Sequence, residues 1–558
     1  MATTRWKVFQ SLQGYESGWL RPDVVAGLTV WAVMIPEALA YASIAGVPPV
    51  AGLYAAVPAL VLYALVGSSR HLVVGPMSAT AALSAAIIAP LAAADSERFV
   101  LLSTALAIAT GVVGLLAGLA RLGFVASFIS EPVLKGFIVG LALTIVIGQV
   151  PKFFGIDKEE GDFFDQLWGV LTGLGDTDWR TAVVGAISLA LVMGLRRWLP
   201  LVPGSLVAVA FGIVAVSVFD LDAQGVAIVG HIDSGLPALG IPDGVGFHDY
   251  LDLLGPALGV LLIGFAEGLG AAKTYAAKSG YQIDANRELY GLGAANLGSG
   301  LASGMVVNGS LSKTAVNGSA GARTQVSGLV VAGLTVVTLL FLTGLFEKLP
   351  EATLAAVVIA AVIELVDVAS LRRLYRVWTE RLGSIYGPAA RPDFVAALAA
   401  MFGVLLFDTL PGLLIGIGVS VLLLLYRASR PHIVTVVKHD SLWLDAERHP
   451  DLPENPELLV VRVEAGLFFA NADHVRASIE DMCTDRTRLV VLDAETSPSI
   501  DVTAASMLAQ LRDSLARRRI AFRIARPIGQ FGDALGAAES GVLPVDVYPT
   551  VRAAVAAE

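Results

Sequence analysis

Three ionisable side chains lie in otherwise apolar stretches of this sequence, namely Glu37, Glu267 and Lys313. A buried carboxyl group without a partner is costly in its charged form, so it takes up a proton or pairs with a cation. Lys313 belongs to the stretch 309–314 (GSLSKT), and 75–80 (GPMSAT) has the same G-x-x-S-x-T pattern. Residues of these types could bind an anion and take up or release a proton.

The two G-x-x-S-x-T stretches each follow a glycine-containing break and open an apolar, alanine-rich segment. Matched interruptions of this kind predict two broken membrane helices whose N-termini meet near the bilayer midplane and attract anions through the helix dipole. A cation in the first helical turn needs a negative partner, so Lys313 is expected to face an anion, Glu267 or both. The hydroxyl groups that could add hydrogen bonds are those of Ser78, Thr80, Ser310, Ser312 and Thr314.

Each of these residues also has a structural interpretation. Glu267 and Glu37 could form hydrogen bonds between helices, and Glu37 follows a proline that interrupts the helical ladder. Lys313 could extend to the cytoplasmic surface, and the hydroxyl groups could cap helices or pack closely. The aromatic residues that could line the site, or only pack beside it, are Tyr41, Tyr63 and Phe265.

The composition is that of a polytopic membrane protein. Of the 558 residues, 55% are apolar and only 15% are charged, whereas soluble proteins carry about 25% charged residues. The single cysteine, Cys483, excludes a disulfide framework, and the sequence contains no P-loop. Residues 1–22 lack the apolar stretch of a cleavable signal peptide. We expect no cofactor, no metal, no nucleic-acid partner and no enzymatic activity.

The apolar runs before residue 430 predict about fourteen membrane segments, of which the third and tenth are too short or too glycine-rich to cross as plain helices. With the N-terminus inside, the lysines and arginines of the loops fall on the cytoplasmic side. The segment 220–256, which has aspartates but no lysine or arginine, then lies outside. The predicted segments are 22–43, 49–67, 75–93, 100–120, 125–150, 181–198, 202–219, 250–272, 287–303, 310–322, 328–346, 350–367, 392–408 and 411–427.

The two halves of this membrane region are expected to form an inverted repeat, because an odd number of segments per half reverses the topology. Residues 37–42 (EALAYA) resemble 267–272 (EGLGAA), which places the two glutamates at equivalent positions in the first and eighth segments. Lys313 then corresponds to Ala79. The two helix ends should therefore differ, the tenth carrying most of the charge and the third mainly hydrogen bonds.

The sequence after residue 430 has a soluble pattern. Strands are predicted at 458–463, 489–493 and 520–524, and helices at 471–482 and 502–517. Alternation of strands and helices indicates a small α/β domain. The predicted organisation is a cytoplasmic N-terminus at 1–21, a transmembrane domain at 22–430 and a cytoplasmic domain at 431–558.

Several motifs resemble the SulP (sulfate permease) family of anion transporters. In the membrane region these are 35–42 (IPEALAYA), 49–56 (PVAGLYAA), 67–71 (GSSRH), 264–267 (GFAE) and 310–317 (SLSKTAVN). In the tail, 466–472 (GLFFANA) and 500–503 (IDVT) resemble the STAS domain of that family.

The resemblance implies a seven-plus-seven inverted repeat with core and gate domains, frequent dimerisation and an elevator-like movement of the core. It implies that Glu267 is the acidic residue of the site. The residues that it implies line the anion site are Ser78, Ala79, Thr80, Ser312 and Lys313.

This sequence departs from the family pattern at four positions. Ala51 stands where the family signature usually has tyrosine, Glu37 where many members have glutamine, and Lys313 where many have arginine. Val502 occupies the place of a phosphorylatable serine in related signalling domains. A second carboxyl group near the site favours proton coupling.

We therefore predict a proton-coupled secondary transporter of sulfate or a similar oxyanion in the cell membrane, forming a homodimer. Substrate binding is assigned to Ser78, Ala79, Thr80, Ser312, Lys313, Glu37, Tyr41 and Phe265, and proton coupling to Glu267 and Glu37. The alternatives are transport of bicarbonate, chloride or a dicarboxylate such as fumarate, with sodium as a possible coupling ion. Less favoured are a nucleobase permease of the same fold and a membrane-anchored signalling protein.

Overall fold

The computed structural model describes residues 8–92, 95–124, 130–159, 161–199, 202–363, 366–376, 391–407, 409–440, 442–453, 455–537 and 546–557. Two compact units divide the chain, one of Met1–Arg373 with Ala396–Ile417 and the other of Leu374–Val395 with Gly418–Glu558. Each unit has hydrophobic clusters of its own.

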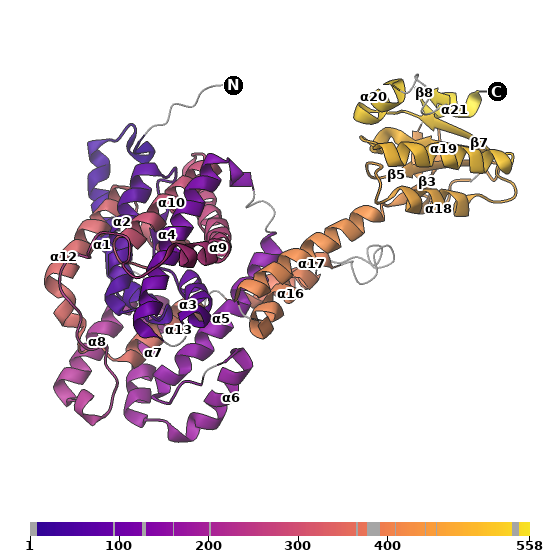
Figure 1. Ribbon diagram of the computed structural model, residues 1–558. Coiled ribbons are helices and arrows are strands. Elements are labelled where there is room, and N and C mark those ends of the chain that lie inside the picture. The colour runs from indigo at the N-terminus through magenta and orange to yellow at the C-terminus, as the bar shows by residue number, and fades with distance from the viewer. Residues whose placement is uncertain are drawn as a thin grey trace. The chain divides into compact units, whose positions relative to one another are not determined.

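Helices are the predominant secondary structure in the described part of the membrane region (Figure 1). Within the described residues, seven helices are long and apolar enough to cross a bilayer, and five shorter apolar helices accompany them. The third and tenth predicted segments are indeed short, with 15 and 9 helical residues. The helices that match predicted segments are α1 (Leu20–Ile44), α2 (Pro49–Val66), α3 (Ser78–Ala92), α4 (Ser96–Leu119), α5 (Glu131–Phe154), α7 (Trp179–Trp198), α8 (Gly204–Phe219), α9 (Phe247–Ser279), α10 (Ala285–Leu301), α11 (Leu311–Ser319), α12 (Val326–Val337), α13 (Glu351–Val362), α16 (Pro392–Phe407) and α17 (Thr409–Ser429).

Several observed boundaries differ from the predicted ones. Helix α12 is continued by a π-helical turn, Thr338–Leu342, and a 3-10 turn, Thr343–Phe346. Helix α13 ends at Val362 and α5 begins at Glu131. The parts of the predicted segments and N-terminus that lie outside the described residues are 1–7, 93, 125–129, 364–365 and 408.

Among the described residues before residue 430, two helices were not predicted, α6 (Phe163–Gly173) and α14 (Val368–Arg376). Both are short and carry charges, so neither produces a long apolar run. Helix α6 begins with a capping box formed by Asp162 and Asp165, which satisfies the first backbone N–H groups. Further 3-10 turns are Gln10–Leu12, Ser17–Trp19, Leu174–Asp176, Asp222–Gln224, Ala446–Arg448 and Ala494–Thr496.

Glycines let α10 approach α4 closely, and α10 also packs against α2 (Figure 1). A Cβ atom added to Gly111 would lie 2.4 Å from the backbone nitrogen of Leu297, and one added to Gly293 would lie 2.7 Å from that of Leu115. Small residues at such crossings are how membrane helices gain close packing in lipid.

Replacement of Gly293 by valine is therefore expected to destabilise the membrane region by about 1–3 kcal/mol, because the new side chain overlaps the backbone of α4. Thermal unfolding of the detergent-solubilised protein measures the loss. The matched control is Gly333→Val in α12, where nothing lies within 4 Å of an added Cβ. Equal losses of stability in the two variants would contradict this account of the crossing.

The C-terminal unit contains a six-stranded sheet of order β4-β3-β5-β6-β7-β8. Strands β5 to β8 are parallel, and β3 is antiparallel to both β4 and β5. The strands are β3 (Ile433–His439), β4 (Leu442–Asp445), β5 (Leu458–Val463), β6 (Leu489–Asp493), β7 (Ala521–Ala525) and β8 (Asp546–Tyr548). Four helices accompany the sheet, α18 (Ala472–Met482), α19 (Val502–Arg517), α20 (Gly529–Ala537) and α21 (Val551–Ala556).

Alternation along the strands gives this sheet two apolar faces. In β5, Val461 packs in a cluster with residues of α18 and α19, whereas Val460 packs in a cluster with Val551 of α21. The predicted strands at 458–463 and 489–493 and the helix at 502–517 are confirmed to the residue, and the other two predicted elements shift by one. Strands β3, β4 and β8 and helices α20 and α21 were not predicted.

Candidate functional site

A two-stranded antiparallel ribbon joins the two halves of the membrane region. Strand β1 (Val73–Gly75) pairs with β2 (Asn308–Ser310), with Val73 opposite Ser310 and Gly75 opposite Asn308. The backbone N–H of Val73 also donates to Thr314 Oγ1 at 3.0 Å. Helix α3 follows β1 and α11 follows β2, so the two helix starts lie beside one ribbon. The structure thus brings both G-x-x-S-x-T motifs together.

Ser310 caps the start of α11. Its hydroxyl oxygen accepts a hydrogen bond from the backbone N–H of Lys313 at 3.2 Å, which satisfies one of the free donors of the first turn. Ser312 is exposed and lies with its hydroxyl 3.1 Å from that of Ser310. Capping is therefore the observed role of Ser310, and the hydroxyl of Ser312 stays accessible at the helix start.

Lys313 is one of the most deeply buried side chains of the membrane region, with 1% of its surface exposed. Its Nζ atom lies 3.0 Å from Glu37 Oε2, donates to the backbone oxygen of Pro76 at 2.9 Å and sits 5.0 Å from the centre of the Tyr41 ring. The structure thus brings Glu37, Tyr41 and Lys313 into direct contact. Lys313 does not extend to a surface.

The negative partner of Lys313 is Glu37 of α1 and not Glu267 of α9, which corrects the expectation from the sequence. Glu37 and Tyr41 are four residues apart and therefore share one face of α1, which packs against α11. That packing decides between the two carboxyl groups, which occupy equivalent positions in the repeat and cannot be distinguished by spacing alone.

The contact between Glu37 and Lys313 is an ion pair without hydrogen-bond alignment. Glu37 is only 7% exposed, and no donor among the described residues is directed at its Oε2 atom. A buried carboxylate is stable only when charge and hydrogen bonds both compensate its lost hydration. Glu37 therefore keeps an acceptor position that a proton could occupy.

The start of α3 contributes differently from the start of α11. Ser78, Ala79 and Thr80 are all buried in its first turn. The Thr80 hydroxyl donates to the backbone oxygen of Met77 at 3.3 Å, so it is engaged locally. The contact of this region with Lys313 comes from the Pro76 carbonyl, an acceptor that helps to hold the ammonium group in place.

Helix α9 approaches the same ribbon with Glu267 and Phe265. The Glu267 carboxylate accepts a hydrogen bond from Asn308 Nδ2 at 3.3 Å and has no ion pair within the described parts of the chain. Phe265 is buried and lines a cavity of about 10 Å³ together with Asn308 and Thr110, roughly the space of one water molecule. Glu267 thus meets the ribbon through Asn308, whereas the hydrogen-bond and ion-pair partners of the Lys313 ammonium group within the described residues are the Pro76 carbonyl and Glu37.

Glu288 of α10 is a buried acid that the sequence reasoning missed. It is 0% exposed and accepts hydrogen bonds from Tyr63 Oη at 2.7 Å, Ser68 N at 2.9 Å, Ser68 Oγ at 2.6 Å and Ser69 N at 3.2 Å. Tyr63 therefore belongs to this network, in agreement with the packing role that the sequence left open for it. An acidic residue inside a predicted membrane segment was the signal that could have identified Glu288.

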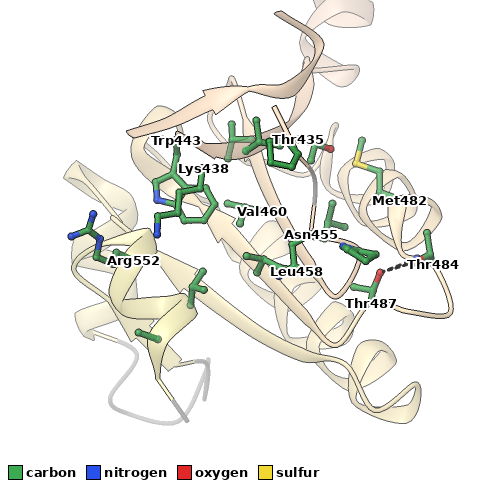
Figure 2. A pocket seen from close by; sticks show the side chains of 17 residues that line it. Thr435, Lys438, Trp443, Asn455, Leu458, Val460, Met482, Thr484, Thr487 and Arg552 are labelled. Atoms are coloured by element: carbon green, nitrogen blue, oxygen red, sulfur yellow. Dashed lines mark hydrogen bonds between the residues drawn. The ribbon is translucent and has the colours of Figure 1, made fainter. Parts of the chain in front are cut away.

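A cavity of about 610 Å³ lies in the C-terminal unit, against the sheet face formed by β3 and β5 (Figure 2). Lys438, Trp443 and Arg552 lie on one side of it, and the hydrogen-bonded pair Thr484 and Thr487 lies on the other. None of the predicted site residues lines this cavity. The residues that line this cavity are therefore different from those that surround Lys313.

Two family models match the chain. The sulfate permease family matches residues 20–383, and the STAS domain matches residues 449–554. The first range contains the buried ion pair. The second contains strands β5 to β8 of the C-terminal sheet, whereas β3 and β4 precede it.

Relatives are similar over almost the whole chain. It is 40% identical over 529 residues to a protein of Mycobacterium tuberculosis named as a probable sulfate transporter, covering 94% of this chain and 92% of that protein. It is 31% identical over 554 residues to Sulfate transporter 1.3 of Arabidopsis thaliana, covering 92% of this chain and 82% of that protein.

Solved structures share the fold. The murine Solute Carrier 26 family member A9 anion transporter in the inward-facing state matches with a TM-score of 0.86 at 22% identity, covering 98% of this chain and 92% of that one. The transmembrane domain of the cyanobacterial bicarbonate transporter BicA matches with a TM-score of 0.61 at 24% identity, covering 72% of this chain and 98% of that one. The predicted fold class, a helical transporter with a C-terminal STAS domain, is confirmed. From its motifs, its matched family model and its relatives, this chain is a membrane-embedded member of the sulfate permease family.

Proposed function

We propose that this protein is a secondary active transporter of sulfate or a similar oxyanion, coupled to protons. The observation that carries the proposal is the burial of Lys313 beside the starts of two helices from opposite halves of the chain. The names of the relatives support sulfate as the substrate. Membership of a transporter family rather than an enzyme family agrees with the expectation that the chain catalyses no reaction.

Charge and helix geometry explain why an anion would bind at this place. A helix N-terminus presents unsatisfied N–H groups and a partial positive charge, and Lys313 adds a full positive charge in the first turn of α11. In a low-dielectric surrounding, the attraction between an anion and this ammonium group is much stronger than in water. The site residues Ser78, Ala79, Thr80, Ser312, Phe265 and Tyr41 would line the bound anion.

The proposal includes four further properties. Protons rather than sodium ions drive accumulation, with Glu267 and Glu37 as the titrating groups. The membrane region moves by an elevator mechanism, and the protein forms a homodimer. Residues 1–21 and the domain at 431–558 lie in the cytoplasm.

Counterflow uptake into proteoliposomes tests the proposal. Purified full-length protein is reconstituted, and uptake of radiolabelled sulfate is competed with unlabelled sulfate, bicarbonate, chloride and fumarate, with pH and sodium gradients varied separately. We expect sulfate to compete best and an inward proton gradient to drive accumulation. Uptake of bicarbonate, chloride or fumarate but not sulfate, or dependence on sodium alone, would replace this proposal by one of the alternatives. Lack of any flux with intact protein would favour a signalling role.

Replacement of Glu267 by glutamine is expected to lower proton-driven accumulation of sulfate by at least about tenfold, because the buried carboxyl group can no longer take up and release a proton. Accumulation in response to an imposed pH gradient is the measurement. Sulfate counterflow without a gradient is the control and should persist, since glutamine can still accept the hydrogen bond from Asn308. Unchanged accumulation would exclude Glu267 from coupling.

A further inference from the structure

We infer that Glu37 is an internal substitute for the transported anion: its carboxylate neutralises Lys313 when the site is empty, and an anion binds by displacing it. The inference rests on the proposed function and adds a competitor that is built into the chain. It starts from the position of Glu37 Oε2, 3.0 Å from the nitrogen that an anion would approach.

Electrostatics explain why the empty site needs such a substitute. An ammonium group that is 1% exposed pays a large desolvation cost unless a negative charge compensates it. Glu37 supplies that charge, and the Pro76 carbonyl and the Tyr41 ring complete the surroundings of the ammonium group. The empty site is therefore close to neutral overall.

The elements around Glu37 provide no second cation. Helices α2, α3, α8, α11, α12 and α13 pack against α1. Within their described bounds, α3, α8 and α12 carry no titratable side chain, α2 carries only Tyr54 and Tyr63, and α13 carries Glu351, which pairs with Lys152 at 3.2 Å. On its own helix, Tyr41 lies one turn away, and Asp23 accepts hydrogen bonds from the Arg323–Thr324 segment. The positive charge that faces Glu37 is thus that of Lys313.

A bound anion then changes the state of Glu37. When the anion takes the place beside Lys313, the Glu37 carboxylate is left buried and next to a second negative charge. Uptake of a proton neutralises the buried carboxylate and removes its repulsion from the bound anion. The Oε2 atom of Glu37 can receive this proton, because no hydrogen-bond donor of the described residues is directed at it. Anion binding should therefore be accompanied by uptake of a proton on Glu37, and affinity should fall as pH rises.

The first experiment measures both events on the wild-type protein. Sulfate is titrated into weakly buffered, detergent-solubilised protein while a pH-sensitive dye reports proton uptake, between about pH 5 and pH 8. We expect sulfate to bind with uptake of up to about one proton, and its affinity to fall by up to about tenfold per pH unit over the range in which binding takes up that proton. Binding without proton uptake across this range would overturn the inference, whatever the transport assays show.

The second experiment uses Glu37→Gln, which keeps the size of the side chain but removes its charge. We expect tighter and nearly pH-independent sulfate binding, and net uptake into sulfate-free liposomes reduced at least about tenfold, because the empty site now carries an uncompensated charge. Glu37→Asp is the matched control and should keep the pH dependence. Wild-type pH dependence in Glu37→Gln would contradict the inference.

These outcomes separate the inference from the proposed function. If wild-type protein moves no oxyanion, the proposed function fails. If it moves sulfate but Glu37→Gln shows unchanged pH dependence of binding, only the role of Glu37 fails. Should Glu37→Gln not fold, the wild-type proton-uptake measurement still decides.

Discussion

Replacement of Lys313 by glutamine is expected to reduce sulfate uptake at least about 100-fold, since it removes a buried positive charge worth several kcal/mol to a bound anion. Lys313 is the cation that lies at the start of α11, in contact with Glu37 and the Pro76 carbonyl. Glutamine can still donate a hydrogen bond but cannot neutralise an anion. Counterflow of radiolabelled sulfate in proteoliposomes and calorimetric titration of sulfate measure the loss.

Two variants separate loss of the anion site from general damage. Lys313→Arg keeps the positive charge and should retain part of the binding, although the larger planar group alters its geometry. The double variant Lys313→Gln with Glu37→Gln removes both charges of the pair, so it should be more stable than Lys313→Gln alone but equally unable to bind sulfate. Wild-type affinity in Lys313→Gln would show that this residue does not hold the anion.

Replacement of Glu288 by alanine is expected to destabilise the membrane region by about 3–5 kcal/mol, because it leaves the buried donors around it without an acceptor. The donors that lose their partner are Tyr63 Oη, Ser68 N, Ser68 Oγ and Ser69 N. The resulting protein should accumulate poorly and unfold at a much lower temperature in detergent. Size-exclusion chromatography after a heating series provides the measurement.

The matched control removes only one of these contacts. Tyr63→Phe deletes a single hydrogen bond to a charged acceptor and should cost about 1.5–3 kcal/mol. The loss of stability in Glu288→Gln should lie between those of Tyr63→Phe and Glu288→Ala, since the amide oxygen of glutamine can still accept hydrogen bonds from the Ser68–Ser69 segment. If Glu288→Ala unfolds at the wild-type temperature, the network does not hold α10 to the loop after α2.

Much of the candidate site follows from the sequence, because apolar runs and repeated motifs are local patterns. The G-x-x-S-x-T pattern identifies the starts of α3 and α11, and the ribbon places these starts side by side. The ribbon itself could not be predicted, since three-residue strands show no periodicity. Its pairing depends on contacts between residues more than 200 positions apart.

The partner of Lys313 shows where sequence reasoning ends. The repeated sequence pattern predicts equivalent positions for Glu37 and Glu267, and both belong to helices that approach the ribbon. Which carboxyl group pairs with Lys313 depends on how α1 and α9 pack against α11. The partner of Tyr63 also depends on helix packing, because its side chain lies on the face of α2 that meets Glu288.

In the C-terminal unit, the buried parallel strands are predicted well because they are continuous apolar runs. Strands β3 and β4 form an antiparallel pair at the edge of the sheet, and β8 has three residues. Such short or partly exposed strands lack a continuous apolar run.

Val502, which occupies the place of a phosphorylatable serine in related signalling domains, lies at the first position of α19 and is exposed.

The β1–β2 ribbon has a mechanical consequence for the membrane region. Its backbone hydrogen bonds tie residues 73–75 to residues 308–310, and the Val73 N–H bond to Thr314 adds a further link. Separation of the two helix starts would break the hydrogen bonds of the ribbon and the bond from Val73 N–H to Thr314, whereas a displacement of both starts together would keep them. These links therefore hold the two helix starts, and Lys313 with them, together as one structural unit. The two halves of the membrane region, although distant in sequence, are thus joined to each other at the helix starts.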